Sequence, residues 1–400
     1  MRIARVRARN IGFSRQPHTL RRNLVTSTSL FDDFNERPGG WLGPVFCTLV
    51  EVETSDGACG VGTAGAFSGG AKAIVEEYLA DLVLGEDPRR HDHLWQRMYR
   101  TLARLGRSGS VMTAISALDI ACWDAHGQAE DKSVVDLLGG MTQTSVPAYV
   151  SRCYALEDLD ELAAEARNYA EQGFTRIKQR FGFGPKDGPE GMRRNRELVE
   201  TVRGAVGEDV QLAADAYMGW DQPYAHDMAM RLKDLRLAWI EEPLMPHEIE
   251  GYRDLRRRTP WQRWSCGEHS YTKWEFADLI TPRAIDYLQP DVNRVGGLTE
   301  ARKVCALAEA AGIPVLPHSN EAHNLHLIFS QPPQVCPLVE YFPDVEPDTG
   351  NELFWRLFDG NTVASDGRVQ LDPTHPGLGV TLNEEAAAHL TVEDGEWVSL

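Results

Sequence analysis

Three acidic residues, each at the end of a short apolar run, constrain the fold of this chain more than any other feature. They are Asp215, Glu241 and Glu268, and they lie 26 and 27 residues apart. A helix-length amphipathic stretch follows each of the first two, as in a parallel α/β barrel that carries one carboxylate at the carboxyl end of each strand. Carboxylates that meet at one rim repel one another, and hard oxygen ligands favour Mg²⁺, with Mn²⁺ second. The spacing predicts a metal site; the alternative is that the acids cap the next helices.

The same period extends over most of the chain. Eight strand-like runs follow one another at intervals of roughly 25–35 residues. The runs cover residues 146–151, 174–180, 210–215, 237–241, 263–268, 284–291, 314–319 and 337–342. They predict an α/β fold, a (β/α)8-type (modified TIM) barrel over residues 141–360 that lacks its last regular helix.

The chain before the barrel has a different pattern. Residues 1–9 and 45–53 alternate as strands do, whereas residues 71–140 read as helices, with a buried helix over 110–125. Strands followed by helices without alternation indicate an α+β capping domain over residues 1–140. The Gly- and Pro-rich segment 361–400 contains short strands, and we expect it to pack back on the capping domain.

An irregular segment interrupts the capping domain between Arg21 and Pro44. Its Pro-Gly-Gly sequence and its aromatic residues suit an ordered loop that covers a site. We expect it to close over a substrate together with the loop near Ala66–Gly70, with Arg37 and Trp41 as candidate substrate contacts.

Charge and composition exclude several classes of protein. The formal net charge of −18 argues against nucleic-acid binding, which needs a basic face, and means that an anionic substrate needs local cations. No apolar run is long enough for a bilayer, and nothing at the N-terminus resembles a secretory signal, so we expect no membrane association. The seven cysteines form no CxxC pair, which suits reduced core thiols in a cytoplasmic protein.

The other predicted strand ends carry chemistry as well. Lys178 and Arg180 alternate at the end of the second strand, so their side chains point the same way. Asp291 and His318 end the sixth and seventh strands, where an Asp beside a His fixes its tautomer and raises its basicity. Glu340 ends the eighth strand. Barrel enzymes place catalytic groups at this rim.

Each of these residues also has a structural interpretation. Lys178 and Arg180 could form a solvated pair, His318 could cap a turn, and Glu340 could be a salt-bridge partner. His269 directly follows Glu268, so its side chain should point away from its neighbour's, and we rate it at best as a substrate contact or as support for the ligands.

Taken together, these residues resemble the enolase superfamily. The subgroup motifs are Trp239-Ile-Glu-Glu-Pro243, Gly267-Glu-His269, Gln289-Pro-Asp-Val292, Gly296-Gly-Leu298 and Pro317-His318. They resemble the mandelate racemase subgroup, and residues 183–195 and 250–255 are similar to acid-sugar dehydratases of the L-rhamnonate dehydratase type. The resemblance covers nearly the whole chain, including the tail at Pro376-Gly-Leu-Gly379.

The resemblance implies roles for these positions. The metal ligands of the family fall on Asp215, Glu241 and Glu268, its Asp–His dyad on Asp291 and His318, and its electrophilic Glu on Glu340. Many members carry Lys-x-Lys on the second strand, whereas this chain has Lys178-Gln-Arg180. Arginine cannot serve as a base at neutral pH, so racemisation, which needs a base on each face of the substrate, becomes less favoured than one-sided dehydration.

The expected reaction is Mg²⁺-dependent dehydration of an acid sugar to a 2-keto-3-deoxy acid. His318 would take the C2 proton and return it to the departing 3-hydroxyl. Two alternatives stay open: a racemase or epimerase of a hydroxy acid, in which Lys178 is a second base, and a non-catalytic metal-binding barrel. Muconate lactonisation is disfavoured because residues 292–295 contain no lysine. Relatives form dimers to octamers, so we expect a homo-oligomer.

Overall fold

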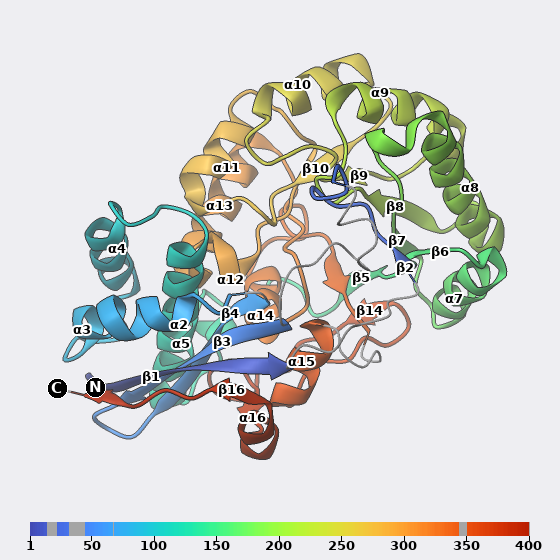
Figure 1. Ribbon diagram of the computed structural model, residues 1–400. Coiled ribbons are helices and arrows are strands. Elements are labelled where there is room, and N and C mark those ends of the chain that lie inside the picture. The colour runs from blue at the N-terminus through green and yellow to red at the C-terminus, as the bar shows by residue number, and fades with distance from the viewer. Residues whose placement is uncertain (14–21, 32–44, 67, 344–349, 400) are drawn as a thin grey trace.

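The structure is a computed structural model that describes residues 1–13, 22–31, 45–66, 68–343 and 350–399. Arg37 and Trp41 lie outside the described residues. A curled parallel sheet surrounded by helices forms one part of the molecule, and an antiparallel sheet with helices forms the other (Figure 1). The expected fold class, a modified barrel with an α+β capping domain, is confirmed.

Seven parallel strands make up the curled sheet, in the order β11-β10-β9-β8-β7-β5-β12. Their bounds are β5 (Val146–Ser151), β7 (Arg176–Arg180), β8 (Gln211–Asp215), β9 (Ile240–Glu241), β10 (Trp264–Cys266), β11 (Tyr287–Leu288) and β12 (Val339–Tyr341). The eighth strand of the sequence, β12, pairs with the first, β5, so the sheet curls back on itself. A short strand, β14 (Arg368–Val369), pairs antiparallel with the start of β5.

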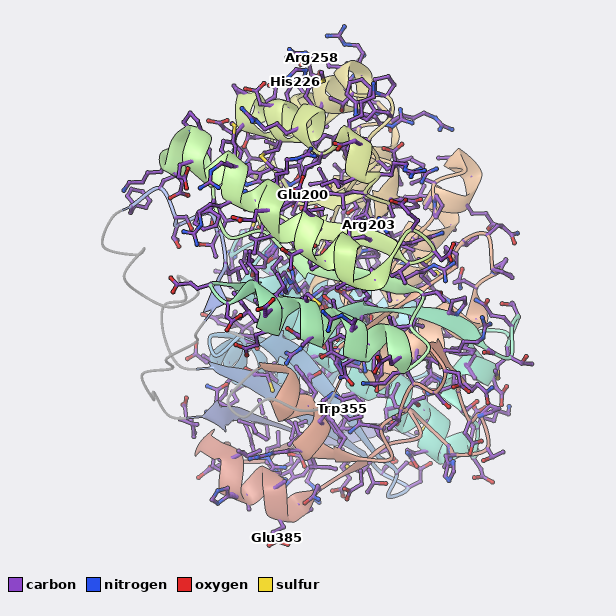
Figure 2. The ribbon with its side chains drawn as sticks, turned by 90° about the vertical axis from the view of Figure 1, so that its right-hand side faces the viewer. Glu200, Arg203, His226, Arg258, Trp355 and Glu385 are labelled. Carbon is purple, nitrogen blue, oxygen red and sulfur yellow. The ribbon has the colours of Figure 1, made fainter. Side chains whose placement is uncertain are left out.

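Helices alternate with these strands and cover the outside of the sheet. They are α7 (Leu159–Glu171), α8 (Gly188–Val206), α9 (Gln222–Arg231), α10 (Ile249–Arg258), α11 (Thr272–Ile280), α13 (Gly297–Ala311) and α14 (Ala322–Ser330). On α8, which Figure 2 shows along the outer wall, Glu200 is exposed while Arg203 is buried. The apolar faces of these helices and the sheet form one continuous core.

The seventh predicted strand is much shorter than expected. Residues 314–319 pair with β11 through a single bridge between Leu288 and Val315. Pro314 and Pro317 lack the N–H groups that a ladder requires, which explains why the pairing does not extend. The segment still runs beside β11, because Leu316 N donates to Leu288 O and His318 N donates to Pro290 O. His318 therefore reaches the same rim as the strand ends.

An antiparallel sheet with strand order β16-β1-β3-β4 forms the centre of the capping domain. Its strands are β1 (Ile3–Phe13), β3 (Val45–Thr54), β4 (Cys59–Ala66) and β16 (Thr391–Glu393), and β17 (Val398–Ser399) also pairs with β1. Both pairings of β1 with the tail are antiparallel, so the end of the chain completes the sheet that the beginning starts. Figure 1 shows the two termini side by side at this sheet.

The helices of the capping domain are α2 (Ala71–Ile74), α3 (Ala80–Val83), α4 (His91–Leu102) and the long α5 (Ser110–Glu130), with a wider helical turn at Val75–Leu79 between α2 and α3. The predicted buried helix is confirmed, because residues 111–125 of α5 are all buried. The helix crosses β4 at glycines: a Cβ on Gly62 would lie 2.1 Å from the carbonyl oxygen of Ala117. Only glycine permits this approach of helix to strand.

The helix α5 also joins the capping domain to the barrel. Asp119 Oδ2 accepts a hydrogen bond from the backbone N–H of Thr299 (2.9 Å), and Trp123 Nε1 donates to Thr299 Oγ1 (2.9 Å). Ser116 Oγ accepts from Gly296 N (2.9 Å) at the short helix α12 (Val292–Val295), which directly follows Asp291. The capping domain is thus hydrogen-bonded to the loop that carries a predicted catalytic residue.

Two further segments lie next to strands of the barrel in space or in sequence. The strand β2 (Arg22–Asn23), at the start of the expected covering loop, pairs with β6 (Ala155–Leu156), and Val25 N donates to Phe181 O just beyond β7. The helix α15 (Gly350–Leu357) follows β12 but packs through Leu357 against the capping sheet, so the described residues after β12 add no regular helix to the barrel wall. None of the helices that the structure describes combines the length and apolar character needed to cross a bilayer.

Candidate active site

The three spaced acids lie at the carboxyl ends of neighbouring strands. Asp215 ends β8, Glu241 ends β9, and Glu268 follows β10 by two residues. Asp215 and Glu241 are direct partners in the parallel register of β8 and β9, so both side chains emerge at the same height. All three residues are buried, with at most 4% of their surface exposed. Burying three carboxylates is unfavourable unless cations balance them.

Lys178 and Arg180 supply part of that balance. Lys178 is fully buried, and its Nζ forms an ion pair with Glu241 and lies 2.6 Å from Glu340 Oε1 and 3.9 Å from Asp215 Oδ2. The guanidinium of Arg180 pairs with Asp215 and donates to Ser151 Oγ (3.0 Å). Burial alone would lower the pKa of Lys178, but the carboxylates raise it above its ordinary value. Both cations are held among the acids rather than solvated.

Asp291 and His318 form a hydrogen-bonded pair. His318 Nδ1 lies 2.9 Å from Asp291 Oδ2, while Nε2 faces the rim 3.4 Å from Glu268 Oε2. Burial lowers the pKa of His318, but the charges of Glu268 and Glu340 and the bond to Asp291 raise it to about 10. The aspartate holds one ring nitrogen and leaves the other for chemistry, which is the arrangement of a general acid–base dyad.

Glu340 lies between the dyad and the cations. One carboxylate oxygen contacts Lys178, and the other accepts a hydrogen bond from Ser319 N (3.0 Å), the residue after His318. Burial would raise the pKa of Glu340, but Lys178, His318 and Arg180 lower it below its ordinary value. In this arrangement Glu340 is ionised and accepts hydrogen bonds rather than donating them.

Sequence reasoning missed Arg294, a half-buried cation of α12. Its Nη1 donates to the carbonyl oxygen of Glu268 (3.1 Å) and lies 3.5 Å from the carboxylate of the same residue. Its Nε lies 3.4 Å from Asp291 Oδ2. Arg294 thus bridges a predicted metal ligand and the dyad acid, and the one available signal was its i,i+3 spacing from Asp291.

His269 departs from the expected orientation. Its Nδ1 lies 2.7 Å from Glu242 Oε2 but also 3.6 Å from Glu268 Oε1, so the ring does not point away from its neighbour. The strict alternation ends with β10, because Gly267 has a φ of +136°. Glu242, Glu268 and His269 offer ligand atoms within 4.8 Å of one another, a set that includes neither Asp215 nor Glu241.

Glu241 is held by two further donors inside the barrel. Trp239 Nε1 donates to Glu241 Oε2 (3.1 Å), and Gln289 Nε2 donates to the same oxygen (2.6 Å). The other oxygen of Glu241 contacts Lys178. Two donors thus hold Oε2, whereas the ammonium group of Lys178 holds Oε1.

The charge balance of the rim fits a divalent cation. The carboxylates outnumber the permanent cations. The acids are Asp215, Glu241, Glu268, Asp291 and Glu340. The cations are Lys178, Arg180 and Arg294. The excess of negative charge, to which the buried Glu242 beside Glu268 also contributes, and the buried oxygen donors suit a hard ion such as Mg²⁺.

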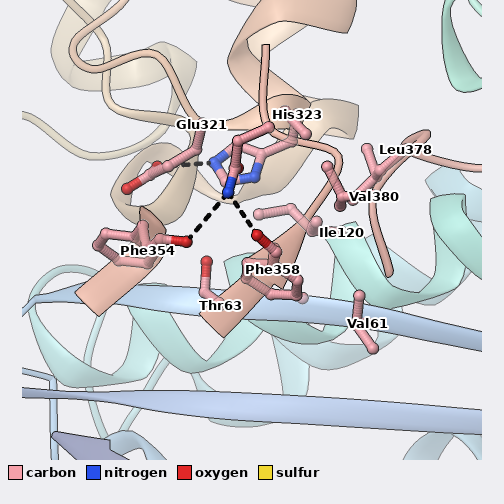
Figure 3. A pocket seen from close by; sticks show the side chains of 12 residues that line it. Val61, Thr63, Ile120, Glu321, His323, Phe354, Phe358, Leu378 and Val380 are labelled. Atoms are coloured by element: carbon pink, nitrogen blue, oxygen red, sulfur yellow. Dashed lines mark hydrogen bonds and ion pairs between the residues drawn. The ribbon is translucent and has the colours of Figure 1, made fainter. Parts of the chain in front are cut away.

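A polar cluster supports the dyad from the side of the capping domain. Asn293 N donates to Asp291 Oδ1 (2.8 Å), and the Asn293 side chain donates to Glu321 and accepts from Thr63 Oγ1 of β4 (2.9 Å). Figure 3 shows Glu321 and His323 pointing toward each other, with 3.1 Å between the carboxylate and the imidazole, beside a cavity of about 20 Å³. His323 of α14 therefore pairs with the acid that holds the Asn293 side chain.

Comparisons with known proteins agree with the geometry. Residues 45–139 match the mandelate racemase / muconate lactonizing enzyme N-terminal domain, and residues 161–386 match the enolase C-terminal domain-like family. An L-rhamnonate dehydratase of Saccharopolyspora erythraea is 35% identical over 340 residues, which cover 84% of this chain and 83% of the relative.

Solved structures extend the likeness to the whole chain. Two crystal structures of L-rhamnonate dehydratase from Gibberella zeae, one complexed with Mg, superpose with a TM-score of 0.85 at 32% and 30% identity, covering 98% of this chain and 96% of theirs. L-Talarate dehydratase from Polaromonas sp. JS666, complexed with Mg and L-glucarate, superposes with a TM-score of 0.81 at 29% identity, covering 100% of this chain and 99% of that one. By its matched domains, its relatives and its barrel, this chain belongs to the enolase superfamily, in its mandelate racemase / muconate lactonizing enzyme family.

Proposed function

We propose that the protein is a Mg²⁺-dependent acid-sugar dehydratase that converts an aldonate, with L-rhamnonate as first choice, to a 2-keto-3-deoxy acid. The observation that carries this proposal is the dyad: Asp291 holds Nδ1 of His318, and Nε2 faces a rim of buried carboxylates. The relatives named L-rhamnonate dehydratase support the substrate class. Other aldonates, such as L-lyxonate and L-mannonate, follow behind L-rhamnonate.

Asp215, Glu241 and Glu268 would hold the metal ion. Bound there, Mg²⁺ supplies an electrophile for the substrate carboxylate and offsets the negative charge that raises the pKa of His318. The ion pairs of Lys178 with Glu241 and of Arg180 with Asp215 would loosen at the same time. Both cations then lie beside the substrate, where they can balance its developing charge.

His318 would carry out both proton transfers. Nε2 takes the proton from C2, and the electron pair of the C–H bond moves into the carboxylate to form an enediolate. The enediolate collapses, the bond from C3 to its hydroxyl breaks, and the proton on Nε2 leaves with the hydroxyl as water. The resulting enol gains a proton at C3 and loses the proton of its C2 hydroxyl, which gives the 2-keto-3-deoxy acid. No oxidant or reductant is needed.

The surroundings of Lys178 and Arg180 favour dehydration over racemisation. Lys178 lies 2.6 Å from Glu340, which is not one of the three predicted metal ligands, and this buried ion pair favours the protonated form of the lysine. Arg180 remains charged in any case. With no neutral base on the second face, turnover in D₂O should give dehydrated product without inverted substrate. Recovery of the C2 epimer would instead favour the epimerase alternative.

A substrate screen tests the proposal. Acid sugars are incubated with the protein and Mg²⁺, and semicarbazide detects 2-keto products. His318→Asn should remove turnover without loss of fold, because the amide keeps a similar size but cannot accept the C2 proton. His226→Asn on α9 is the matched control, since His226 lies on the outer surface (Figure 2). Near-normal turnover by His318→Asn, or no keto product from any acid sugar, would contradict the proposal; the second result favours a non-catalytic barrel.

The proposal also covers the residues that contact the substrate, the oligomeric state and the location of the protein in the cell. Arg37 and Trp41 stay candidate contacts for the sugar tail, which the position of β2 at the rim supports. His269 lies between Glu242 and Glu268, so it could contact a substrate hydroxyl. A homo-oligomer and a cytoplasmic location also stay predictions.

A further inference from the structure

A second concave site lies at the opposite end of the barrel. It is a cavity of about 510 Å³, lined by residues that precede or begin β8, β9, β10 and β11, including Val210, Leu237, Arg263 and Tyr287. The acids of the candidate active site lie at the other ends of these strands. Tyr149, Ala213, Trp239 and Leu316 pack together inside the barrel. This apolar layer lies between the cavity and the candidate active site.

Cations dominate the lining of this cavity. Arg203, Lys233, Arg236 and Arg263 contribute four positive charges, whereas Glu208 is the one acid among the lining residues. The whole chain has a formal net charge of −18, so this excess runs against its composition. A local group of cations in a concave surface attracts anions even when the overall field repels them.

Three of the four cations have no acid partner among the described residues. Arg236 pairs with Glu208 at 2.7 Å, and both side chains are exposed. Arg203, 8% exposed, donates to the carbonyl oxygens of Val210 (2.6 Å) and Gly207 (2.9 Å), and its buried Nε has no hydrogen-bond partner. A buried guanidinium that meets only carbonyl oxygens keeps its full charge for a nearby anion.

The other two unpaired cations are exposed at the cavity. Lys233 Nζ lies 4.4 Å from the ring centroid of Trp261, which is 38% exposed. Arg263 precedes β10 and is exposed, and none of the acids that the structure describes forms an ion pair with it. Trp239 and Tyr287 add aromatic surface to the lining. The cavity therefore combines several uncompensated cations with aromatic walls.

We propose that this cavity binds a small organic or inorganic polyanion that carries phosphate or carboxylate groups. Arginine pairs with either group through two parallel hydrogen bonds, and lysine adds a point charge. The aromatic walls would contact the apolar part of an organic ligand. Such a ligand lies against Trp239, whose indole donates to Glu241 at the other end of the barrel. The proposal of this anion site does not depend on the proposed catalytic function.

Calorimetric titration of metal-free protein at low salt tests the proposal, with pyrophosphate and citrate as probes. We expect one site per chain, and the stronger probe shows whether phosphate or carboxylate is preferred. Lys233→Gln combined with Arg263→Gln should weaken binding roughly tenfold or more, because each substitution removes an unpaired cation. Both residues are exposed, so the fold should survive, and circular dichroism checks this.

The control combines Lys132→Gln with Arg253→Gln, which removes the same charge from exposed positions outside the cavity. Its affinity should stay within about twofold of wild type, because neither side chain lines the cavity and exposed charges in water interact only weakly at a distance. The proposal is overturned if neither probe binds, if the control loses as much affinity as the cavity variant, or if the cavity variant binds as the wild type does. The last result would place the anion elsewhere, for example at the catalytic rim.

Discussion

Replacing Lys178 with methionine tests how the rim is held together. The ammonium group lies among three buried carboxylates: it pairs with Glu241, lies 2.6 Å from Glu340 and is 3.9 Å from Asp215. Lys178→Met keeps an unbranched side chain of similar length and removes the charge. The partners are at most 2% exposed, so water cannot take over the role of the ammonium.

The expected loss is large. Removing one partner of a buried ion pair costs roughly 3–5 kcal/mol of folding free energy, because the remaining charges stay buried and unpaired. The acids can respond by binding protons, which relieves the repulsion at low pH. Burial already raises the pKa of Glu241, and without Lys178 this pKa should rise further. A raised folded pKa of an acid means that stability falls as pH rises, so the loss should be larger at pH 8 than at pH 5.

The assay is chemical denaturation of the metal-free protein at both pH values, together with Mg²⁺ titration by calorimetry. Lys178→Met should lose roughly 3–5 kcal/mol of folding free energy. The variant should also bind Mg²⁺ more tightly than the wild type does, because the ion no longer competes with the ammonium group for the carboxylates. The double variant Lys178→Met with Glu340→Gln should recover part of the stability, since one unpaired charge is removed as well. If Lys178→Met costs less than about 1 kcal/mol at pH 8 and leaves Mg²⁺ affinity unchanged, the reasoning about the rim is wrong.

Three further predictions concern other parts of the fold. Asp291→Asn should lower turnover roughly 10³- to 10⁴-fold, because the imidazole loses the partner that sets its tautomer, and steady-state kinetics measures this. Burial raises the pKa of Asp119 to about 7, so its contribution to stability falls as pH rises from about 4 to 7, and Asp119→Asn should flatten that slope in denaturation experiments. Gly62→Ala should destabilise the protein by several kcal/mol because its Cβ would lie 2.1 Å from a carbonyl oxygen of α5. Gly204→Ala is the control: its Cβ meets nothing within 4 Å, so thermal melting should show about 0.5–1 kcal/mol of stabilisation.

Much of the barrel could be predicted because its rules are local. A strand, a turn and a helix repeat with nearly constant length, and the residue that ends each apolar run marks the carboxyl end of a strand. This is why Asp215, Glu241 and Glu340 were placed on the rim from their spacing alone. The seventh strand was the exception, because two prolines remove the hydrogen bonds that would extend it beyond one bridge.

The contacts between strand ends could not be predicted in the same way. Arg294 reaches Glu268, and Glu242 reaches His269, across segments that are separated in the sequence. Such contacts depend on the curl of the sheet and on where the alternation of side chains stops, neither of which appears in a local pattern.

By itself, the sequence determined the kinds of groups at the rim, their order around the barrel and the family to which the chain belongs. Only the tertiary structure decided that Lys178 lies among the carboxylates, that Nε2 of His318 faces them, and that a group of cations collects at the far end of the barrel. The physical reason is that the period of a sequence pattern specifies which face of a strand or helix a side chain lies on. The burial and the charge environment of that side chain depend on all the segments that the fold brings together at one point.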